Sequence, residues 1–252
     1  MAQDVVENKN VGVGAEMIRL RNFGIGFGHR TLIDKANLAV RGSMLTALIG
    51  RNGAGKSTLL RAIAGLNTDY QGDIEICGHN LRTASPMTIA KSLSYVSTGR
   101  QRISAMRCSD IVAMGRAPYT NWIGRLSEAD KAAVADAIAD VGMTEYSQRQ
   151  IDTLSDGEYQ RIMIARALAQ DTPVLLLDEP TSFLDIPNRY ALCRLLADLA
   201  HKRNKCIVFS THELDIAVKL VDSLAVINPP GVEFGSVGQV VDSGVISRLF
   251  EV

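Results

Sequence analysis

Short apolar runs alternate with amphipathic stretches along most of the chain. The runs Met44–Ile49, Val174–Leu177 and Cys206–Ser210 are almost entirely apolar and of strand length, which is typical of strands buried on both faces of a parallel sheet. Amphipathic stretches follow such runs, for example 57–64, which ends at a glycine, and one that Pro187 opens at its first turn. Strands that alternate with helices predict an α/β fold whose parallel strands are joined by helical crossovers.

The two ends of the chain differ from this pattern. Residues 1–16 mix charged and small polar side chains without periodicity, which predicts a flexible tail that is too polar for a signal peptide. One folded domain is predicted over 17–252. Within it, 18–20 alternates like a strand and 32–40 contains further short β-like pieces. An apolar stripe at 246–250 stops abruptly, as though more chain followed.

The middle of the domain, about residues 99–160, is predicted to be a helical subdomain inserted into the core. Apolar side chains recur at helical spacing in 129–141, and 110–115 forms a second, shorter helix. Ser127 and Asp130 have the spacing of a capping box, in which the two side chains satisfy backbone amides at the start of a helix.

Composition supports a globular domain and excludes several classes of protein. Hydrophobic residues make up 46% of the 252 residues, enough for a core, and 27 basic residues balance 27 acidic ones, so a strongly basic nucleic-acid-binding protein is not expected. No apolar run reaches the roughly 18 residues that a membrane-spanning helix needs. The four cysteines lack metal-ligand spacing and predict reduced thiols in a cytoplasmic protein.

A phosphate-binding loop is the strongest chemical signal in the chain. The segment 50–57 reads GRNGAGKS, fits GxxxxGK[ST] and lies between a predicted buried strand and a predicted helix. In such a loop the glycines let backbone amides converge on phosphate oxygens, and Lys56 reaches the β- and γ-phosphates. Ser57 supplies a hydroxyl ligand to Mg²⁺. The sequence therefore predicts a nucleoside triphosphate site with Mg²⁺.

Two carboxylates directly follow the predicted strand Val174–Leu177. Asp178 and Glu179 stand at the edge where open parallel sheets bind ligands. Asp178 is expected to hold Mg²⁺, directly or through a water, and Glu179 to polarise the attacking water as general base. His212 follows another buried strand at the same edge, where a γ-phosphate contact would lie, although a lone histidine is often structural.

Four segments stand in a definite order: GRNGAGKST at 50–58, LSDGE at 154–158, LLLDEPTSFLD at 175–185 and STHE at 210–213. In this order and spacing they resemble the ATPase subunits of ABC transporters, and the resemblance covers about residues 18–229. It implies a P-loop NTPase fold of the ABC type, with a RecA-like parallel-sheet core, an N-terminal antiparallel β subdomain and the inserted helical subdomain. It also implies an enzyme that hydrolyses ATP to drive transport.

Carried over by this resemblance, individual residues receive expected roles. Ser155 and Gly157 belong to the signature segment, which closes over the ATP held by a second copy, and Phe27 stacks on adenine. The signature departs from the usual LSGGQ, since Asp156 and Glu158 replace glycine and glutamine. The expected ATP-binding set is Phe27, Gly50, Asn52, Gly53, Ala54, Gly55, Lys56, Ser57, Thr58, Ser155 and Gly157; the expected catalytic set is Glu179, His212 and Lys56; the expected Mg²⁺ set is Ser57, Asp178 and, weakly, Thr98.

A glutamine that is usual in this family is absent. The family places it at the end of the strand that corresponds to Leu93–Val96, where it contacts Mg²⁺ and the attacking water. Thr98 stands at that position, and the nearest glutamine is Gln101. A threonine hydroxyl reaches less far than a glutamine amide, so Thr98 is expected to touch the metal shell only through a water. The alternative is that Gln101 enters the site.

The segments MGRAPY at 114–119 and GRLSEAD at 124–130 resemble the ATPases of importers for ferric siderophores, haem and cobalamin. The resemblance implies a peripheral protein on the cytoplasmic face of the inner membrane. It would act as a homodimer with integral-membrane permease subunits and, indirectly, a substrate-binding protein, and would bind no nucleic acid. Tyr119 and Trp122 either line a groove for a permease helix or pack inside the helical subdomain.

A non-transport ABC ATPase of the DNA-repair or chromosome-maintenance type is the alternative function. Those proteins usually interrupt the ATPase domain with long coiled coils, and this sequence contains no sustained heptads.

Overall fold

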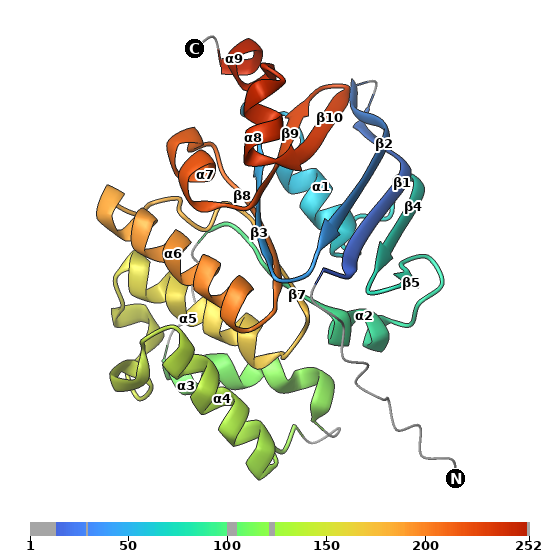
Figure 1. Ribbon diagram of the computed structural model, residues 1–252. Helices are drawn as coiled ribbons and strands as arrows, with labels where there is room; N and C mark the ends of the chain where they lie inside the picture. Colours follow the sequence, from blue (N-terminus) through green and yellow to red (C-terminus); the bar gives the residue numbers. More distant parts are fainter. Residues whose placement is uncertain (1–13, 29, 100–104, 121–123, 251–252) are drawn as a thin grey trace.

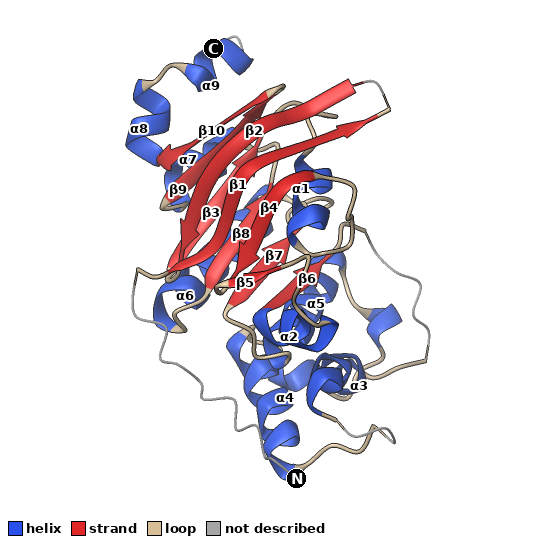
Figure 2. Ribbon diagram, turned by 90° about the vertical axis from the view of Figure 1, so that its right-hand side faces the viewer, coloured by secondary structure: helices blue, strands red, loops and turns tan. Residues whose placement is uncertain are grey.

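Two β-sheets organise the part of the chain that the computed structural model describes, residues 14–28, 30–99, 105–120 and 124–250 (Figures 1 and 2). The larger sheet has six strands in the order β10-β9-β3-β8-β7-β6, and the smaller has four in the order β2-β1-β4-β5. Figure 1 shows helix α1 between the two sheets and helices α5 and α6 on the other side of the larger one.

The larger sheet is the parallel core that the alternating pattern predicts. Its strands β6, β7, β8, β3 and β9 pair in parallel, and only β10 runs antiparallel to its neighbour β9. The strand bounds are β3 Met44–Ile49, β6 Leu93–Val96, β7 Val174–Leu177, β8 Cys206–Ser210, β9 Ser223–Asn228 and β10 Gly231–Ser236.

The smaller sheet is antiparallel throughout, as the resemblance implies for the N-terminal region. Its strands are β1 Glu16–Phe27, β2 Arg30–Arg41, β4 Gln71–Ile76 and β5 His79–Asn80. Strand β1 begins at Glu16, so the predicted tail over 1–16 is one residue too long, and residues 1–13 lie outside the described residues. The short pieces expected in 32–40 form one strand, because β-bulges in the β1–β2 ladder let it continue through irregular positions.

Nine α-helices are described: α1 Lys56–Ile63, α2 Pro86–Ser92, α3 Cys108–Ala113, α4 Glu128–Asp140, α5 Asp156–Ala169, α6 Ile186–Lys202, α7 Leu214–Leu220, α8 Val237–Asp242 and α9 Val245–Phe250. Short 3₁₀ helices follow α3 and α4, at Met114–Tyr119, Thr144–Tyr146 and Ile151–Thr153. Helix α5 crosses the end predicted for the helical subdomain near residue 160. The same helix therefore belongs to the insert at its start and to the sheet core at its end.

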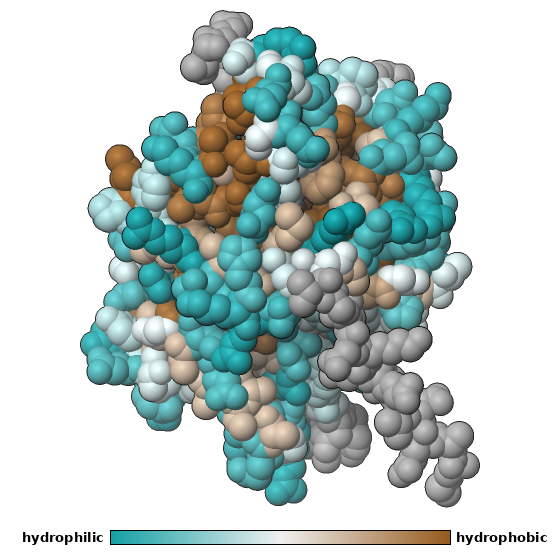
Figure 3. Space-filling view, in the orientation of Figure 1, coloured by the Kyte–Doolittle hydropathy of each residue, from teal (hydrophilic) through white to brown (hydrophobic). Residues whose placement is uncertain are grey.

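The hydrophobic core fills both faces of the larger sheet. Leu175 and Leu177 of β7 belong to a cluster with α5 and α6, whereas Val174 and Leu176 join a second cluster with α1 and the smaller sheet. This alternation explains why the buried strands contain almost no polar residues. Within the stripe at 246–250, Ile246 and Leu249 are buried in the first cluster. Figure 3 shows hydrophobic side chains gathered near α7, α8 and β9, and a more hydrophilic surface over α5 and α6.

A buried ion pair joins the insert to the core. Arg116 Nε donates to Asp130 Oδ1 of α4 over 2.8 Å, and Arg116 Nη1 donates to the carbonyl of Ala169 at the end of α5 over 2.7 Å. Ser127 and Asp130 form the predicted capping box at the start of α4. Hydrogen bonds from Ser127 and the nearby Arg116 lower the pKa of Asp130 from 3.8 to about 2.

Replacing Asp130 with asparagine is expected to lower the free energy of unfolding at pH 7 by about 3 kcal/mol, because the Arg116 guanidinium stays buried without its counterion. Since the folded-state pKa lies below the unfolded one, the carboxylate stabilises the fold above about pH 4, and this effect is lost as the pH falls to about 2. Urea unfolding at pH 7 and pH 2.5 measures both effects. The exposed Asp136→Asn is the control; equal stability of both variants at pH 7 would contradict the prediction.

Candidate nucleotide and metal site

The phosphate loop connects the end of β3 to the start of α1, as the motif requires. Its first residue must be glycine, because a Cβ at Gly50 would lie 2.8 Å from the carbonyl oxygen of Ile227. Gly55 has a φ of 107°, a conformation that side chains rarely adopt, and directly precedes the first residue of α1. The loop amides therefore meet the positive end of the helix dipole, which favours a bound anion.

Lys56 lies at the base of this loop and is almost fully buried, with 5% of its surface exposed. Its Nζ donates to the carbonyl oxygen of Gly50 over 2.9 Å. Burial lowers the pKa of Lys56, and the nearby Glu179 and Asp178 oppose that shift. Lys56 also lines a hollow of about 180 Å³, whose lining is Leu32, Asn52, Gly53, Gly55, Lys56, Ser57, Thr58 and Glu179.

Two of the residues predicted to bind Mg²⁺, Ser57 and Asp178, are in contact. Ser57 of α1 donates its hydroxyl hydrogen to Asp178 Oδ1 over 2.9 Å, and Asp178 directly follows β7. Hydroxyl and carboxylate oxygens are the ligands that Mg²⁺ prefers, usually together with water and phosphate oxygens. The oxygen atoms present therefore fit Mg²⁺, and Ser57 and Asp178 would be the ligands that the protein supplies.

Glu179 and His212 also come together at this edge of the sheet. Glu179 Oε2 accepts a hydrogen bond from the Ser182 hydroxyl over 3.0 Å and lies 4.0 Å from Nδ1 of His212. About a quarter of the Glu179 side chain is exposed, so its carboxylate can reach water. The predicted base and the predicted phosphate contact are thus neighbours at the carboxyl ends of β7 and β8.

Thr98 lies beside these carboxylates, but its hydroxyl points to the backbone. Its Oγ1 donates to the carbonyl oxygen of Asp178 over 2.9 Å. The role of Thr98 in the metal shell stays a prediction, and the rival Gln101 lies outside the described residues.

Thr98→Ala is expected to slow ATP hydrolysis by less than about tenfold, since its described hydrogen bond goes to a main-chain oxygen rather than to a reacting group. Gln101→Ala is expected to slow it even less. Steady-state hydrolysis at saturating ATP measures both variants. A large loss in the Gln101 variant would show that this glutamine, rather than Thr98, serves the γ-phosphate.

The signature segment does not reach the phosphate loop of its own chain. Ser155 caps α5, where its hydroxyl donates to Glu158 Oε2 over 2.8 Å and its backbone amide donates to the same oxygen over 2.8 Å. These hydrogen bonds lower the pKa of Glu158. The unusual Glu158 thus has a structural use at the start of the helix, and neither Ser155 nor Gly157 lines the hollow at the phosphate loop.

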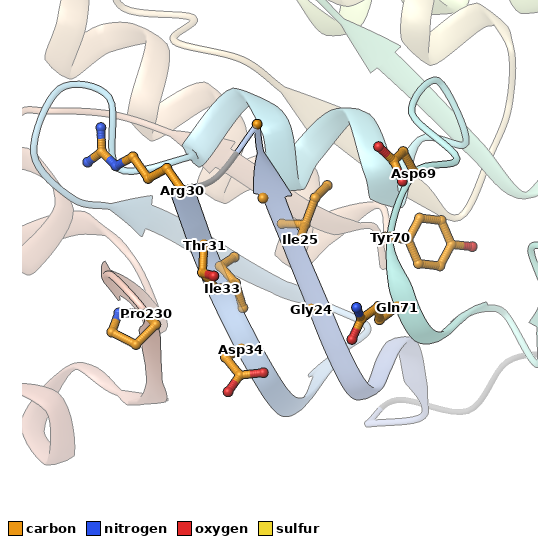
Figure 4. A pocket seen from close by; sticks show the side chains of 12 residues that line it. Gly24, Ile25, Arg30, Thr31, Ile33, Asp34, Asp69, Tyr70, Gln71 and Pro230 are labelled. Carbon is orange, nitrogen blue, oxygen red and sulfur yellow. The ribbon is translucent and has the colours of Figure 1, made fainter.

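Phe27 ends β1 with 84% of its surface exposed, so its ring is accessible for stacking. Its neighbours Gly26 and Gly28 line a separate hollow of about 570 Å³ between β1, β2 and the segment before β4 (Figure 4). Figure 4 shows Asp34 of β2 at one side of this hollow and Tyr70 at the other. Among the described residues, none lines both this hollow and the one at the phosphate loop.

Three hydroxyl groups that the sequence did not single out contact the paired carboxylates. Ser182 binds Glu179, Ser210 binds Asp178 over 2.7 Å, and the Tyr95 hydroxyl lies 3.4 Å from Asp178 Oδ2. Ser210 had a sequence signal, because it closes an otherwise apolar strand at the edge where ligands bind. Ser182 lies within the segment LLLDEPTSFLD, which the sequence singled out only as a whole, and Tyr95 had no comparable signal.

A family model described as "ABC transporter" matches residues 33–182, more than half of the chain. The chain belongs to the ABC transporter family. It is an ATP-binding subunit of that family, and such subunits hydrolyse ATP.

Individual relatives of this ABC ATPase match along most of its length. The achromobactin transport ATP-binding protein of Dickeya dadantii is 33% identical over 92% of this chain and 87% of its own. The hemin import ATP-binding protein of Nocardia farcinica is 38% identical over 88% of this chain and 76% of its own. A solved ABC transporter assigned to the metal-chelate type, in an inward-facing conformation, has a TM-score of 0.83 and 29% identity, covering 94% of this chain and 90% of the matched chain. The predicted ABC-type fold is thereby confirmed.

The described helices of this ABC ATPase include none long and apolar enough to cross a membrane.

Proposed function

We propose that this ABC ATPase drives the import of an iron–siderophore, haem or cobalamin-type substrate through a membrane permease. The observation that carries the proposal is the similarity along most of the chain to subunits named for achromobactin transport and hemin import. The segments at 114–119 and 124–130 support the same class of substrate, because they resemble segments of the ATPases of such importers. In this proposal the protein is peripheral, on the cytoplasmic face of the membrane, and a substrate-binding protein delivers the cargo to the permease.

The contacts at the site support the chemistry proposed for it. The loop amides and Lys56 would hold the phosphates, and Ser57 and Asp178 would hold Mg²⁺. When bound, the ion would offset phosphate charge and help to orient the γ-phosphoryl group. Glu179 takes the proton of the attacking water. His212, whose Nδ1 lies 4.0 Å from Glu179 Oε2, contacts the γ-phosphate.

The proposed active unit is a homodimer in which a second copy supplies Ser155 and Gly157. Within one chain these residues do not line the phosphate-loop hollow. The segment after Glu179 also exposes apolar surface, because Phe183 and Ile186 are 77% and 66% exposed. Phe183 has a φ of 69°, an unfavourable conformation for a bulky residue in solvent. A second copy that covers this segment would remove the apolar surface from water.

The proposed permease contact is an apolar groove of about 380 Å³ between the end of α1 and helix α2. Leu66, which lines the groove, is 65% exposed, and Met87 of α2 is 52% exposed. Tyr119 lies near this surface, 38% exposed, with Arg116 over one ring face at 4.0 Å and Lys91 of α2 at 5.4 Å. An amphipathic permease helix is the occupant that fits such a surface. The other candidate for this groove, Trp122, lies outside the described residues.

Uptake in a strain that lacks this chain tests the proposal. Labelled ferric siderophore, haem and cobalamin are supplied separately, and the strain is complemented with wild type or Glu179→Gln. Uptake of one substrate class is expected to require the wild-type chain and to fail with the variant. Normal uptake of all three, together with sensitivity to DNA damage, would instead favour the non-transport alternative.

A further inference from the structure

Ser210 makes two hydrogen bonds to the residues at the centre of the proposed mechanism. It is the last residue of β8 and fully buried. Its hydroxyl donates to Asp178 Oδ1 over 2.7 Å and accepts from the backbone amide of Glu179 over 2.8 Å. One side chain thus bridges the proposed metal ligand and the proposed general base.

The amide that Ser210 accepts from belongs to a strained residue. Glu179 has a φ of 47°, in the left-handed region that costs a non-glycine residue free energy. This conformation turns the chain sharply after β7, and the Glu179 carboxylate comes to lie near Ser182 and His212. A hydrogen bond to the Glu179 amide opposes relaxation of that turn. Without the Ser210 hydroxyl, the Glu179 amide would also lose this hydrogen-bond partner, which costs free energy.

The bridge needs a group that donates and accepts at once. A hydroxyl does both, whereas a thiol is weak in both roles and a methyl group has neither. The strands themselves do not depend on it, because β8 pairs with β7 and with β3 through backbone ladders, for instance at Leu177 with Phe209 and at Leu48 with Ser210. The hydroxyl is therefore available for the carboxylates rather than for sheet assembly.

We propose that Ser210 is a positioning residue for ATP hydrolysis, which holds Glu179 and Asp178 in place through its hydroxyl. The proposal rests on the assignment of Glu179 as base and Asp178 as metal ligand. It extends that assignment to strand β8, whose end leads into Thr211 and His212. The strand thereby links the histidine segment to the base.

Ser210→Cys and Ser210→Thr separate hydroxyl from volume, because the first keeps the size of the side chain and the second keeps the hydroxyl. Ser210→Cys is expected to lower kcat by about tenfold or more, with KM for ATP within twofold, and Ser210→Thr to retain most of the activity. Ser223→Cys is the matched control, since Ser223 is a buried strand serine bound to Thr46 Oγ1 over 2.8 Å. Its kcat is expected to stay unchanged.

Hydrogen exchange in the nucleotide-free protein supplies a readout independent of turnover. The Glu179 amide is expected to exchange about tenfold faster or more in Ser210→Cys than in wild type, while the Ser223→Cys control leaves it unchanged. Wild-type kcat in Ser210→Cys would overturn the proposal, as would unchanged exchange at Glu179. A folded Ser210→Thr protein no more active than Ser210→Cys would overturn it as well.

A double variant distinguishes this proposal from the assignment beneath it. Because Ser210 acts in part through Glu179, Ser210→Cys is expected to cause a clearly smaller loss in a Glu179→Gln background than in wild type. A full additional loss would show a general structural effect and overturn the positioning role. If Glu179→Gln hydrolyses ATP at the wild-type rate, the assignment of Glu179 as base fails. If Glu179→Gln is slow but Ser210→Cys hydrolyses ATP at the wild-type rate, only the positioning role of Ser210 fails.

Discussion

Glu179→Gln is expected to lower ATP turnover by about 100-fold or more while ATP binding is kept. The glutamine has nearly the same size and can still accept the Ser182 hydrogen bond that Glu179 Oε2 accepts over 3.0 Å, but it cannot take a proton from water. Phosphate release at saturating ATP measures turnover, and calorimetry measures ATP affinity. The exposed Glu128→Gln is the control for loss of one negative charge.

The same variant is expected to accumulate as a dimer when ATP is present, because bound nucleotide joins the two copies and hydrolysis separates them. Size-exclusion chromatography with and without ATP shows the shift. A Glu179→Gln protein that stays monomeric and hydrolyses ATP like wild type would remove both the base and the homodimer from the proposed mechanism.

Lys56→Ala is expected to weaken ATP binding by about 100-fold or more, because the phosphates lose a charge-assisted hydrogen bond in a partly desolvated loop. Lys56 is 5% exposed and lies against the loop carbonyl of Gly50, so no neighbouring cation is placed to replace it among the residues that line its hollow. Calorimetric titration with ATP measures the affinity. The exposed Lys131→Ala is the control, and unchanged affinity in Lys56→Ala would contradict the phosphate-loop assignment.

Much of the local structure could be predicted from the sequence, because its causes are local. The phosphate loop requires glycines at set positions, and the structure shows why: Gly50 is too close to Ile227 for a side chain, and Gly55 has a positive φ. The capping box of Ser127 and Asp130 depends on a spacing of three residues along one helix turn. Helix α4 begins at Glu128, one residue before the predicted 129, because the Ser127 cap rather than the apolar pattern decides its start.

The edge of the sheet where the site lies was also predictable in outline. Buried parallel strands place their carboxyl ends together, so residues that follow β3, β7 and β8 had to meet at one edge. Lys56, Asp178 and His212 follow those strands and do lie there. Their expected roles come from the phosphate-loop motif, from their place at the strand ends and from the resemblance to ABC ATPases.

The individual contacts within that edge were decided only by the tertiary structure. The hydrogen bond between Ser57 and Asp178 and the bridge from Ser210 to Glu179 join segments far apart in the chain. Their geometry depends on strand register and on the left-handed turn at Glu179, which no local pattern specifies. Thr98 likewise stands at the position that the sequence predicted, yet packing directs its hydroxyl to a backbone carbonyl. The sequence determined which chemical groups reach the site, because motif spacing and strand ends are local properties, whereas the tertiary structure decided which of those groups touch, because contacts depend on how distant segments pack.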